Sequence, residues 1–452
     1  MLISFELENW RSFRDKSTLN LVASREKQHS NRLPFIEKYK LKLLPTTAIY
    51  GGNASGKSNF FSAFRFAQTL VLEGIPLKSP IPVLPFRLDS DLEKLPTRFK
   101  FVIVVSTGQG VDTINQDECY EYSFAVSRSH VIEERLIWIK STAEKILFAR
   151  KEGEKTVFDS SIRNDENLYR ILDSTRDNQL FLTNAANQNI EKYKTDKLIQ
   201  VYRWFERLTL ICPDRQVSTL AFWNRRQKDE LHPLEHILSK MGTGITRLDF
   251  EDVDKMASPF PHGFIETALK PIPDGTSVLV TYFKRRYLLQ RNSDAVSIKQ
   301  LISFHASADS KRKTIRFDLA DDSDGTIRVI DLLPCFLTAI EQNTGVYIID
   351  ELDRSLHTLL VRRLLEYYLS SCSHVSRSQI IFTTHDVMQM DQELLRRDEM
   401  CVTDRKNDGS TELIPFSSYR DIRKDKSVRT SYLHGQLGGV PNLPLNDLFS
   451  FQ

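Results

Sequence analysis

The chain of 452 residues has few of the features that mark several classes of protein. No apolar run of about 18 residues occurs, and the acidic, alternating N-terminus is unlike a signal peptide. We therefore expect a cytoplasmic protein with no membrane association. The cysteines show no C-x-x-C spacing, so a disulfide framework or zinc knuckle is not expected and a reducing compartment is favoured. They are Cys119, Cys212, Cys335, Cys372 and Cys401.

Neither sign of charge dominates. Lysine and arginine total 62 and aspartate and glutamate 59, so the formal net charge of +3 gives no global argument for nucleic-acid binding. Local basic runs have no interleaved aromatic residues and fit solvated faces best. Contact with nucleic-acid phosphates or an acidic partner is the alternative. The runs are Arg285-Arg286, Lys311–Lys313, and Arg420, Arg423, Lys424, Lys426 and Arg429.

One stretch of the chain carries a specific chemical pattern. Gly51-Gly52-Asn53-Ala54-Ser55-Gly56-Lys57-Ser58 fits G-x-x-x-x-G-K-[ST], a loop whose backbone N–H groups cradle a nucleoside triphosphate. Its glycines let the backbone curl around phosphates, Lys57 brings a positive charge, and Ser58 offers a hydroxyl to Mg²⁺. Lys57 is therefore also a catalytic candidate, and Ser58 a metal ligand. The predicted nucleotide contacts are Gly51, Asn53, Ala54, Ser55, Gly56, Lys57 and Ser58.

The residues around this loop support the prediction. Residues 46–50 are typical of a short buried strand, and apolar residues recur at helical spacing from Phe60 to Val71, before Gly74 and Pro76. The loop would then lie between a strand and a helix N-terminus, whose partial positive charge favours anions. Position 60 itself is assigned no role in the site.

The N-terminal residues alternate between apolar and polar types at 3–7 and again at 19–23, which predicts a β-hairpin. Its connection contains Asn9-Trp10-Arg11-Ser12-Phe13, an aromatic and cationic turn. This turn is either an ordinary exposed loop or a border of the nucleotide site, in which case Arg11 would bind the nucleotide.

The middle of the chain is less specific. A proline-rich passage at 76–96 precedes four strand-like runs at 99–105, 120–126, 131–139 and 145–149, whose density indicates an antiparallel sheet. From about residue 159 the pattern becomes helical, with apolar stripes at 190–205 and 231–238 that favour packing surfaces over ligand sites. Further strands are expected at 278–282, 287–290 and 314–319.

Two later strands end in residues that would complete a phosphate-hydrolysing site. Residues 345–349 form an apolar run followed by Asp350 and Glu351, which could hold Mg²⁺ and polarise the attacking water, respectively. Residues 379–383 precede Thr384-His385, so His385 could hydrogen-bond a γ-phosphate. The plainer interpretations are a surface turn for the two acids and a capping residue for the histidine.

A third short motif precedes a predicted helix at 327–339. Asp321-Asp322-Ser323-Asp324-Gly325-Thr326 places Ser, Gly and Thr at the helix N-terminus, where they could bind an anion. By itself this pattern indicates only a helix N-cap.

In this order, the motifs resemble the ATP-binding cassette ATPases of the SMC, RecF and OLD type. The resemblance covers about residues 1–405, and Asn9–Phe13 matches the N-terminal motif of the RecF and OLD branch. It implies an α/β ABC-ATPase head: a mixed sheet with a P-loop core, an antiparallel β-subdomain and a short helical insertion. ATP and Mg²⁺ would be the cofactors.

The same resemblance implies self-association in a head-to-tail ATP sandwich, with higher homo-oligomers as an alternative. Ser323, Gly325 and Thr326 of one subunit would face the P-loop of another, and Asp353 would be the D-loop residue that crosses the interface. The chain departs from transporters and SMC proteins in having Ser-Asp-Gly-Thr instead of Ser-Gly-Gly, and no Q-loop glutamine is assigned.

The Ser-Asp-Gly-Thr motif, the short insertion and the tail at 432–441 further resemble ATPases of bacterial phage-defence systems. These are the PtuA ATPases of Septu, then the AriA ATPases of PARIS and the AbiL-type ATPases. Only 452 − 385 = 67 residues follow His385, too few for the Toprim nuclease domain of OLD proteins. The resemblance therefore implies a regulatory ATPase with a separate effector nuclease, of HNH type if Septu.

We expect four segments: an N-terminal ATPase lobe at 1–158, a mainly helical insertion at 159–270, a C-terminal ATPase lobe at 271–405 and a tail at 406–452. Two other functions stay open. One is a RecF-like DNA-repair clamp without an effector, and the other is a scaffold that holds ATP structurally. A hydrolytic acid such as Glu351 has no purpose in a scaffold.

Overall fold

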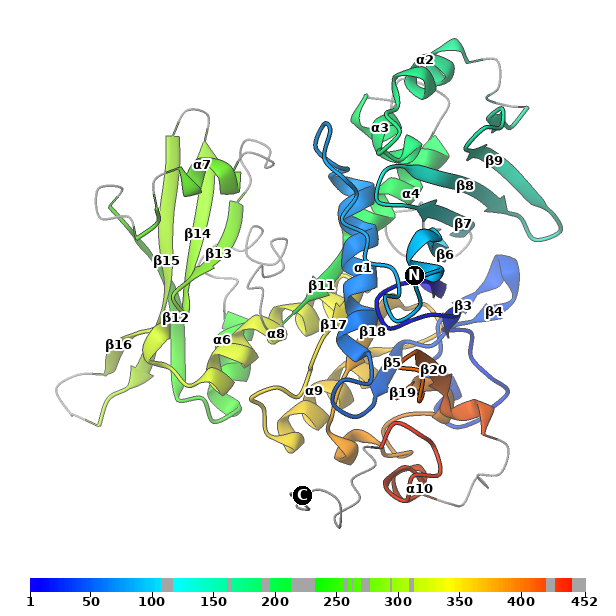
Figure 1. Cartoon of the computed structure of the whole chain (residues 1–452). Helices are drawn as coiled ribbons and strands as arrows, with labels where there is room; N and C mark the ends of the chain where they lie inside the picture. The colour runs from blue at the N-terminus through cyan, green and yellow to red at the C-terminus, as the bar shows by residue number, and fades with distance from the viewer. Residues whose placement is uncertain are drawn as a thin grey trace, which may run out of the picture. The chain divides into compact units, whose positions relative to one another are not determined.

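The computed structural model of the chain forms two compact units, labelled by element in Figure 1. The first contains Met1–Leu210, Asn343–Leu352 and Leu369–Gln452, and the second contains Ile211–Gln342 and Asp353–Tyr368. The structure describes residues 1–106, 117–160, 162, 165–188, 196–212, 232–254, 259–261, 263–269, 277–292, 295–308, 313–419 and 427–440.

The first unit is built on a sheet whose central strands are parallel. Strand β5 pairs with β18 and β19, and β18 pairs with β17, all in parallel, whereas β20 is antiparallel to β19. All residues of β5 and β18 are buried, as expected for parallel strands covered on both faces. The strand order is β11 (Leu208–Ile211), β17 (Thr344–Ile349), β18 (Arg377–Thr383), β5 (Thr46–Tyr50), β19 (Met400–Arg405) and β20 (Thr411–Pro415).

A second, antiparallel sheet belongs to the same unit. It packs aromatic side chains against helix α1 (Lys57–Leu72): the ring centroid of Phe64 on the helix lies 4.0 Å from that of Phe5 and 6.0 Å from that of Phe101. This packing fixes the helix that begins at the phosphate loop. The strand order is β10 (Val157–Phe158), β9 (Glu144–Lys151), β8 (Val131–Ile139), β7 (Asp117–Val126), β6 (Thr97–Ser106), β1 (Leu2–Glu8) and β2 (Ser17–Asn20).

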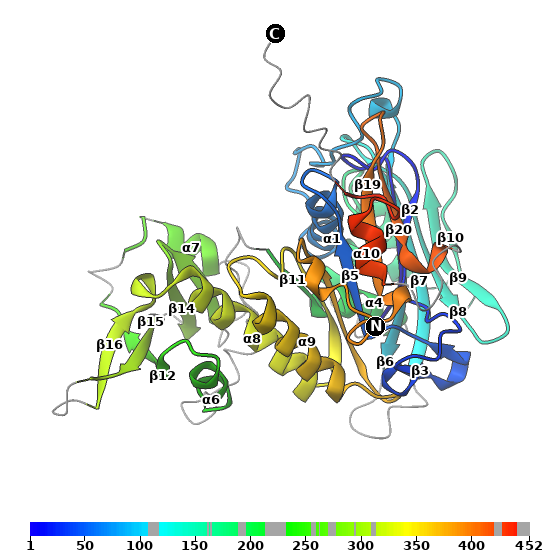
Figure 2. The same ribbon diagram turned by 90° about the horizontal axis from the view of Figure 1, so that it is seen from below.

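Smaller elements complete the first unit. Phe205 of α4 lies 5.0 Å from Phe101 between ring centroids, so this helix also packs on the antiparallel sheet. Figure 2 shows α10, in red, next to β19 and β20. The elements are the β3–β4 pair (Phe35–Ile36, Leu41–Lys42), α2 (Glu166–Ser174), α3 (Phe181–Asn187), α4 (Asp196–Arg207) and α10 (Val428–Leu433).

The second unit contains its own antiparallel sheet. A buried cluster that includes Leu269, Tyr287 and Leu289 forms its core. The strand order is β12 (Ile245–Asp252), β15 (Ala295–Ala306), β14 (Arg285–Asn292) and β13 (Ser277–Tyr282), with β16 (Thr314–Asp318) also paired to β15. The helices are α6 (His232–Lys240), α7 (Phe264–Leu269), α8 (Asp324–Glu341) and most of α9 (Thr358–Ser371).

Most elements expected from the sequence are confirmed, including the N-terminal hairpin, the strand before the phosphate loop and the antiparallel sheet. The fold is the expected mixed α/β head with a parallel P-loop sheet and an antiparallel subdomain. Strands β12, β15, β19 and β20 were not foreseen, and the expected insertion at 159–270 includes β11 and β12 beside its helices. The four-segment division stays a prediction.

Several residues named from the sequence lie outside the described residues. They include Ile190 and Tyr193 of the expected apolar stripe, Leu231, Lys311 and Arg312, and the basic residues at 420–426.

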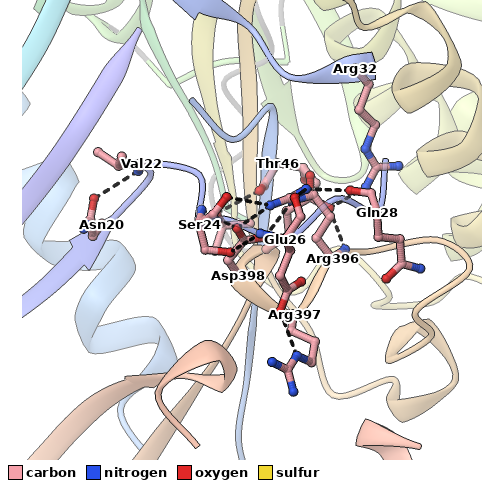
Figure 3. A network of polar contacts seen from close by, with 12 residues as sticks. Asn20, Val22, Ser24, Glu26, Gln28, Arg32, Thr46, Arg396, Arg397 and Asp398 are labelled. Carbon is pink, nitrogen blue, oxygen red and sulfur yellow. Dashed lines mark hydrogen bonds and ion pairs between the residues drawn. The ribbon is translucent and has the colours of Figure 1, made fainter. Parts of the chain in front are cut away.

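A buried network of charges lies just before β19 (Figure 3). The guanidinium of Arg396, which is fully buried, donates to Asp398 from Nε at 2.8 Å and from Nη2 at 2.7 Å. Asp398 also accepts the N–H of Ser24 at 2.7 Å, and Arg32 pairs with Glu399. These bonds tie residues 24–32 to the beginning of the strand.

The same network changes the titration of its acids. Burial raises the pKa of Glu399 to about 7, against the attraction of Arg32. The pKa of Asp398 is lowered because hydrogen bonds from Arg396 and Ser24 outweigh the effect of burial.

Candidate nucleotide-binding site

A cavity of about 440 Å³ in the first unit brings together residues from five separate parts of the chain, one of which is the N-terminal turn at Ser12. It joins the phosphate loop, the acid after β17, the histidine after β18 and the end of β19. The loop leaves the carboxyl end of β5, so these groups meet at the carboxyl ends of parallel strands, where α/β sheets bind ligands. The lining residues are Ser12, Asn53, Ala54, Ser55, Gly56, Lys57, Ser58, Asn59, Glu351, His385 and Arg405.

The phosphate loop is wound around the ammonium group of Lys57. Lys57 Nζ donates to the carbonyl oxygens of Gly51 at 2.7 Å and Gly52 at 2.9 Å, and it lies 3.4 Å from His385 Nδ1. Helix α1 begins at Lys57, so its first N–H groups have no partner within the helix. A cation and a helix N-terminus therefore converge on one wall of the cavity.

The loop backbone is held in conformations that ordinary residues avoid. Gly56, the N-cap of α1, has φ = 111°, and a Cβ there would lie 2.5 Å from Thr411 Oγ1. Ala54 has φ = 60° although it carries a side chain. Strain of this kind gathers where a backbone is shaped for a ligand.

A second layer of residues supports the loop from β19 and β20, and the sequence motifs did not identify it. Thr403 Oγ1 and Ser55 Oγ are hydrogen-bonded at 2.7 Å, and Thr411 Oγ1 donates to the Ser55 carbonyl at 2.9 Å. Thr411 N also donates to the Ser12 carbonyl at 2.7 Å. The available signal was the Asp408-Gly409 turn between two short apolar runs, which is typical of a hairpin.

The two acids after β17 face different surroundings. Asp350 is buried, and its Oδ1 accepts a hydrogen bond from Thr383 Oγ1 at 2.6 Å. The N–H of Glu351 donates to the same Thr383 Oγ1 at 2.8 Å. Glu351 lines the cavity and has φ = 50°, a left-handed conformation that is unusual for glutamate. Thr383 thus links the carboxylate of Asp350 to the backbone of Glu351.

Two further side chains complete the cavity. His385 lines it beside Lys57, as the sequence predicted for a residue after β18. Arg405, at the end of β19, adds a cation that the sequence analysis did not select.

Arg11 is not among the residues that line the cavity. Its Nη1 donates to Asn59 Oδ1 at 3.4 Å, and Asn59 does line it. Burial, together with the nearby Arg65, lowers the pKa of Arg11. The predicted nucleotide contact from Arg11 stays a prediction, whereas its neighbour Ser12 reaches the cavity.

The signature-like residues and Asp353 belong to the second unit. Ser323 is the N-cap of α8, and its Oγ accepts the N–H of Thr326 at 3.1 Å. A Cβ on Gly325 would lie 2.7 Å from the carbonyl oxygen of Ser355, two residues after Asp353. The segment Ser323–Thr326 and the segment that follows Asp353 thus lie close together within the second unit.

The donor set around the cavity suits a magnesium-bound triphosphate. The ammonium of Lys57 and the N-terminal amides of α1 match phosphate oxygens, and Ser58 offers a hydroxyl. Asp350 is not among the lining residues; its buried carboxylate, which accepts a hydrogen bond from Thr383, directly precedes the lining residue Glu351. Within the described residues, no group of three His, Cys, Asp or Glu side chains could hold a metal ion by itself.

Comparison with known proteins identifies the class. Residues 46–390 match the family described as "AAA domain, putative AbiEii toxin, Type IV TA system". This match covers most of the chain, which therefore belongs to that family and is an AAA-type P-loop ATPase. A search among curated proteins found no match.

Solved structures that match the chain include heads of SMC proteins. The SMC head domain from Thermotoga maritima is 12% identical, with 92% of this chain and 98% of that chain covered and a TM-score of 0.33. An SMC head bound to the C-terminal winged-helix domain of ScpA is 12% identical, with coverage of 91% and 97% and a TM-score of 0.38. The head with an extended coiled coil derived from Pyrococcus furiosus is 14% identical, with coverage of 91% and 95% and a TM-score of 0.35. We draw no functional conclusion from scores this low.

No helix in the described part of the chain is both long and apolar enough to cross a membrane.

Proposed function

We propose that this protein is the ATP-binding and ATP-hydrolysing regulatory subunit of a bacterial antiviral complex. It dimerises around ATP and controls a separate effector nuclease in the cytoplasm. The observation that supports this proposal most strongly is the single cavity that joins Lys57, Glu351 and His385. Membership of the family described as "AAA domain, putative AbiEii toxin, Type IV TA system" supports the defence part of this proposal.

Hydrolysis would depend on position and charge more than on covalent chemistry. Lys57 offsets the charge of the β- and γ-phosphates, and His385 hydrogen-bonds the γ-phosphate from the same side. Glu351 aligns the attacking water and accepts its proton, while Thr383 holds the acid in place. Mg²⁺, held by Ser58 and Asp350, would neutralise phosphate charge.

Dimerisation would complete this site. Ser323, Gly325 and Thr326 of one subunit would meet the nucleotide of the other, and Asp353 would cross the interface. The exposed N-terminus of α8, capped by Ser323, supports this proposal because its hydroxyl and amides suit phosphate oxygens. The four-segment organisation at 1–158, 159–270, 271–405 and 406–452 is proposed with it.

Dimerisation can be measured by sedimentation with MgATP in the Glu351→Gln background, in which ATP persists. We expect a dimer, and adding Ser323→Arg should return it to a monomer that still binds ATP. Asp165→Arg, which alters the N-cap of α2, is the matched control and should remain dimeric. A Ser323→Arg protein that still dimerises would refute the head-to-tail arrangement.

The proposal of a separate effector nuclease rests on the resemblance to phage-defence ATPases, among which Septu is preferred and PARIS comes second. A neighbouring HNH nuclease gene would support Septu, and a neighbouring Toprim gene would support PARIS. The main alternative is a RecF-like DNA-repair clamp. Tight DNA binding by the protein alone, with affinity that falls steeply as salt rises, would favour that alternative.

A further inference from the structure

The segment 427–440 lies against the phosphate loop, far from it in sequence. It contains α10 and continues to Gly439, whose carbonyl oxygen accepts a hydrogen bond from the N–H of Gly52 at 2.7 Å. Figure 2 shows α10, in red, next to β19 and β20, the strands whose threonines also hold the loop. No residue of this segment belongs to the motifs that define the ATP site.

Gly439 is itself held on both sides. Its N–H donates to Asp404 Oδ1 at 2.8 Å, and Tyr432 Oη donates to its carbonyl at 3.1 Å. Two residues earlier, the carbonyl of the fully buried Leu437 accepts a hydrogen bond from Tyr419 Oη at 2.7 Å. Side chains of the first unit thus hold both Leu437 and Gly439, whose carbonyl contacts the loop.

The packing at Gly439 leaves no room for a side chain. A Cβ at this position would lie 2.2 Å from Val402 Cγ2 and 3.1 Å from the Thr403 carbonyl oxygen, with the Cα of Gly51 at 3.6 Å. Gly439 also has φ = 67°, which favours glycine. A displacement of Gly439 would therefore also shift the loop residues that it contacts, Gly51 and Gly52.

A short chain of contacts connects the segment to the catalytic lysine. Gly439 holds the N–H of Gly52, and the carbonyl of Gly52 accepts a hydrogen bond from Lys57 Nζ at 2.9 Å. A shift of the Gly52 peptide would change where the ammonium group lies, and so where it can meet a phosphate.

We propose that the segment 427–440 is a positioning element of the phosphate loop, and that its docking is coupled to nucleotide occupancy. The docked segment raises nucleotide affinity, and bound nucleotide stabilises the docked segment by the same factor, because coupling between sites is reciprocal. This inference rests on the proposed ATP-binding function. It gives the ATPase a surface element through which occupancy of the site can be sensed.

The central test compares two glycine substitutions in the full chain. Gly439→Ala adds a methyl group that clashes, whereas Gly435→Ala adds one with nothing within 4 Å, at a similar φ of 73° against 67°. We expect Gly439→Ala to raise the Kd and KM for MgATP about 10-fold, with kcat changed less than about 2-fold. Gly435→Ala should resemble the parent.

One outcome would overturn the inference, and another would overturn the proposed function on which it rests. Equal MgATP affinities for the two variants and the parent would show that the segment does not position the loop. If the parent itself binds no MgATP, the proposed function fails first.

If the Gly439→Ala protein does not fold, a second measurement, made on the parent, tests the inference. Hydrogen exchange of residues 428–440 in the parent should slow about 10-fold when a non-hydrolysable ATP analogue is bound with Mg²⁺. Tyr432→Phe, which removes only the hydrogen bond to Gly439, should weaken analogue binding and reduce this slowing. Unchanged exchange in the parent at saturating analogue would overturn the coupling.

Discussion

Strand β19 has two contrasting ends. Before its first residue, Arg396, Asp398, Arg32 and Glu399 form a buried network tied to a distant loop (Figure 3). At its other end, Thr403 supports the phosphate loop, and Arg405 lines a cavity with unusual backbone conformations at Ala54 and Glu351. The charge network before β19 holds the sheet to residues 24–32, whereas the other end of β19 contributes to a cavity lined by cations and by residues with left-handed backbone conformations.

The contrast shows how one sheet can serve both stability and function. Buried charges at the first end form a network within the protein, whereas the cations at the cavity end line a space that suits phosphate oxygens. We therefore expect substitutions at the first end to change the free energy of unfolding. Substitutions at the cavity end should change nucleotide affinity or turnover. The predictions below test this separation.

The largest expected effect on stability is that of Arg396→Met. It would leave the carboxylate of Asp398 buried without its guanidinium partner, so we expect unfolding to become easier by about 3–5 kcal/mol. Denaturant unfolding measures this, with the exposed Arg363→Met as control. The folded fraction should keep its MgATP affinity. A change below 1 kcal/mol would show that the network does not stabilise the sheet.

At the cavity end, Lys57→Ala should change nucleotide affinity and leave stability nearly unchanged. Removing the ammonium group deprives the phosphates of their buried cation, so we expect MgATP affinity to fall about 100-fold or more with little change in melting temperature. Calorimetric titration measures the affinity. Lys406→Ala, on the β19–β20 hairpin and paired with Glu412, is the control and should bind normally. Normal MgATP binding by Lys57→Ala would show that this cavity is not the nucleotide-binding site.

Glu399 should make stability depend on pH. Its pKa is about 7 in the folded protein against an ordinary 4.5, so the folded state binds the proton more tightly. The stabilisation is complete below pH 4.5 and is lost as the pH rises through 7. We expect Glu399→Gln to reduce the loss of stability between pH 5.5 and 8 by about 1–3 kcal/mol. Denaturant unfolding at the two pH values checks this, and an unchanged pH dependence would contradict it.

The smallest expected effect is that of Thr403→Val. It removes a hydroxyl bonded to Ser55 Oγ, so we expect MgATP to bind about 3- to 10-fold more weakly. Thr47→Val, on β5, is the control. Within the described residues the Thr47 hydroxyl donates to the carbonyl of Thr46, so this variant should leave MgATP affinity unchanged. Equal affinities for the two variants would show that Thr403 does not support the loop.

Local patterns in the sequence pointed to Lys57, Glu351 and His385, and the structure brings these three side chains together in one cavity. Each belongs to a short motif at the end of a buried strand; the roles assigned to them, and to Asp350, stay predictions. The supporting layer could not be found in this way. Thr403 meets Ser55 across 348 positions, and Gly439 meets Gly52 through backbone atoms alone, which leave no pattern of side-chain types. Strands β19 and β20 were missed although the Asp408-Gly409 turn between them is typical of a hairpin.

The measurement that tests the central claim most directly is ATP binding and turnover by Glu351→Gln. The substitution keeps the shape of the side chain but removes the carboxylate that aligns water. We predict a Kd for MgATP within about 3-fold of the parent and turnover reduced about 100-fold or more. Hydrolysis at the parent rate would contradict the assignment of Glu351, and with it our account of how this cavity works.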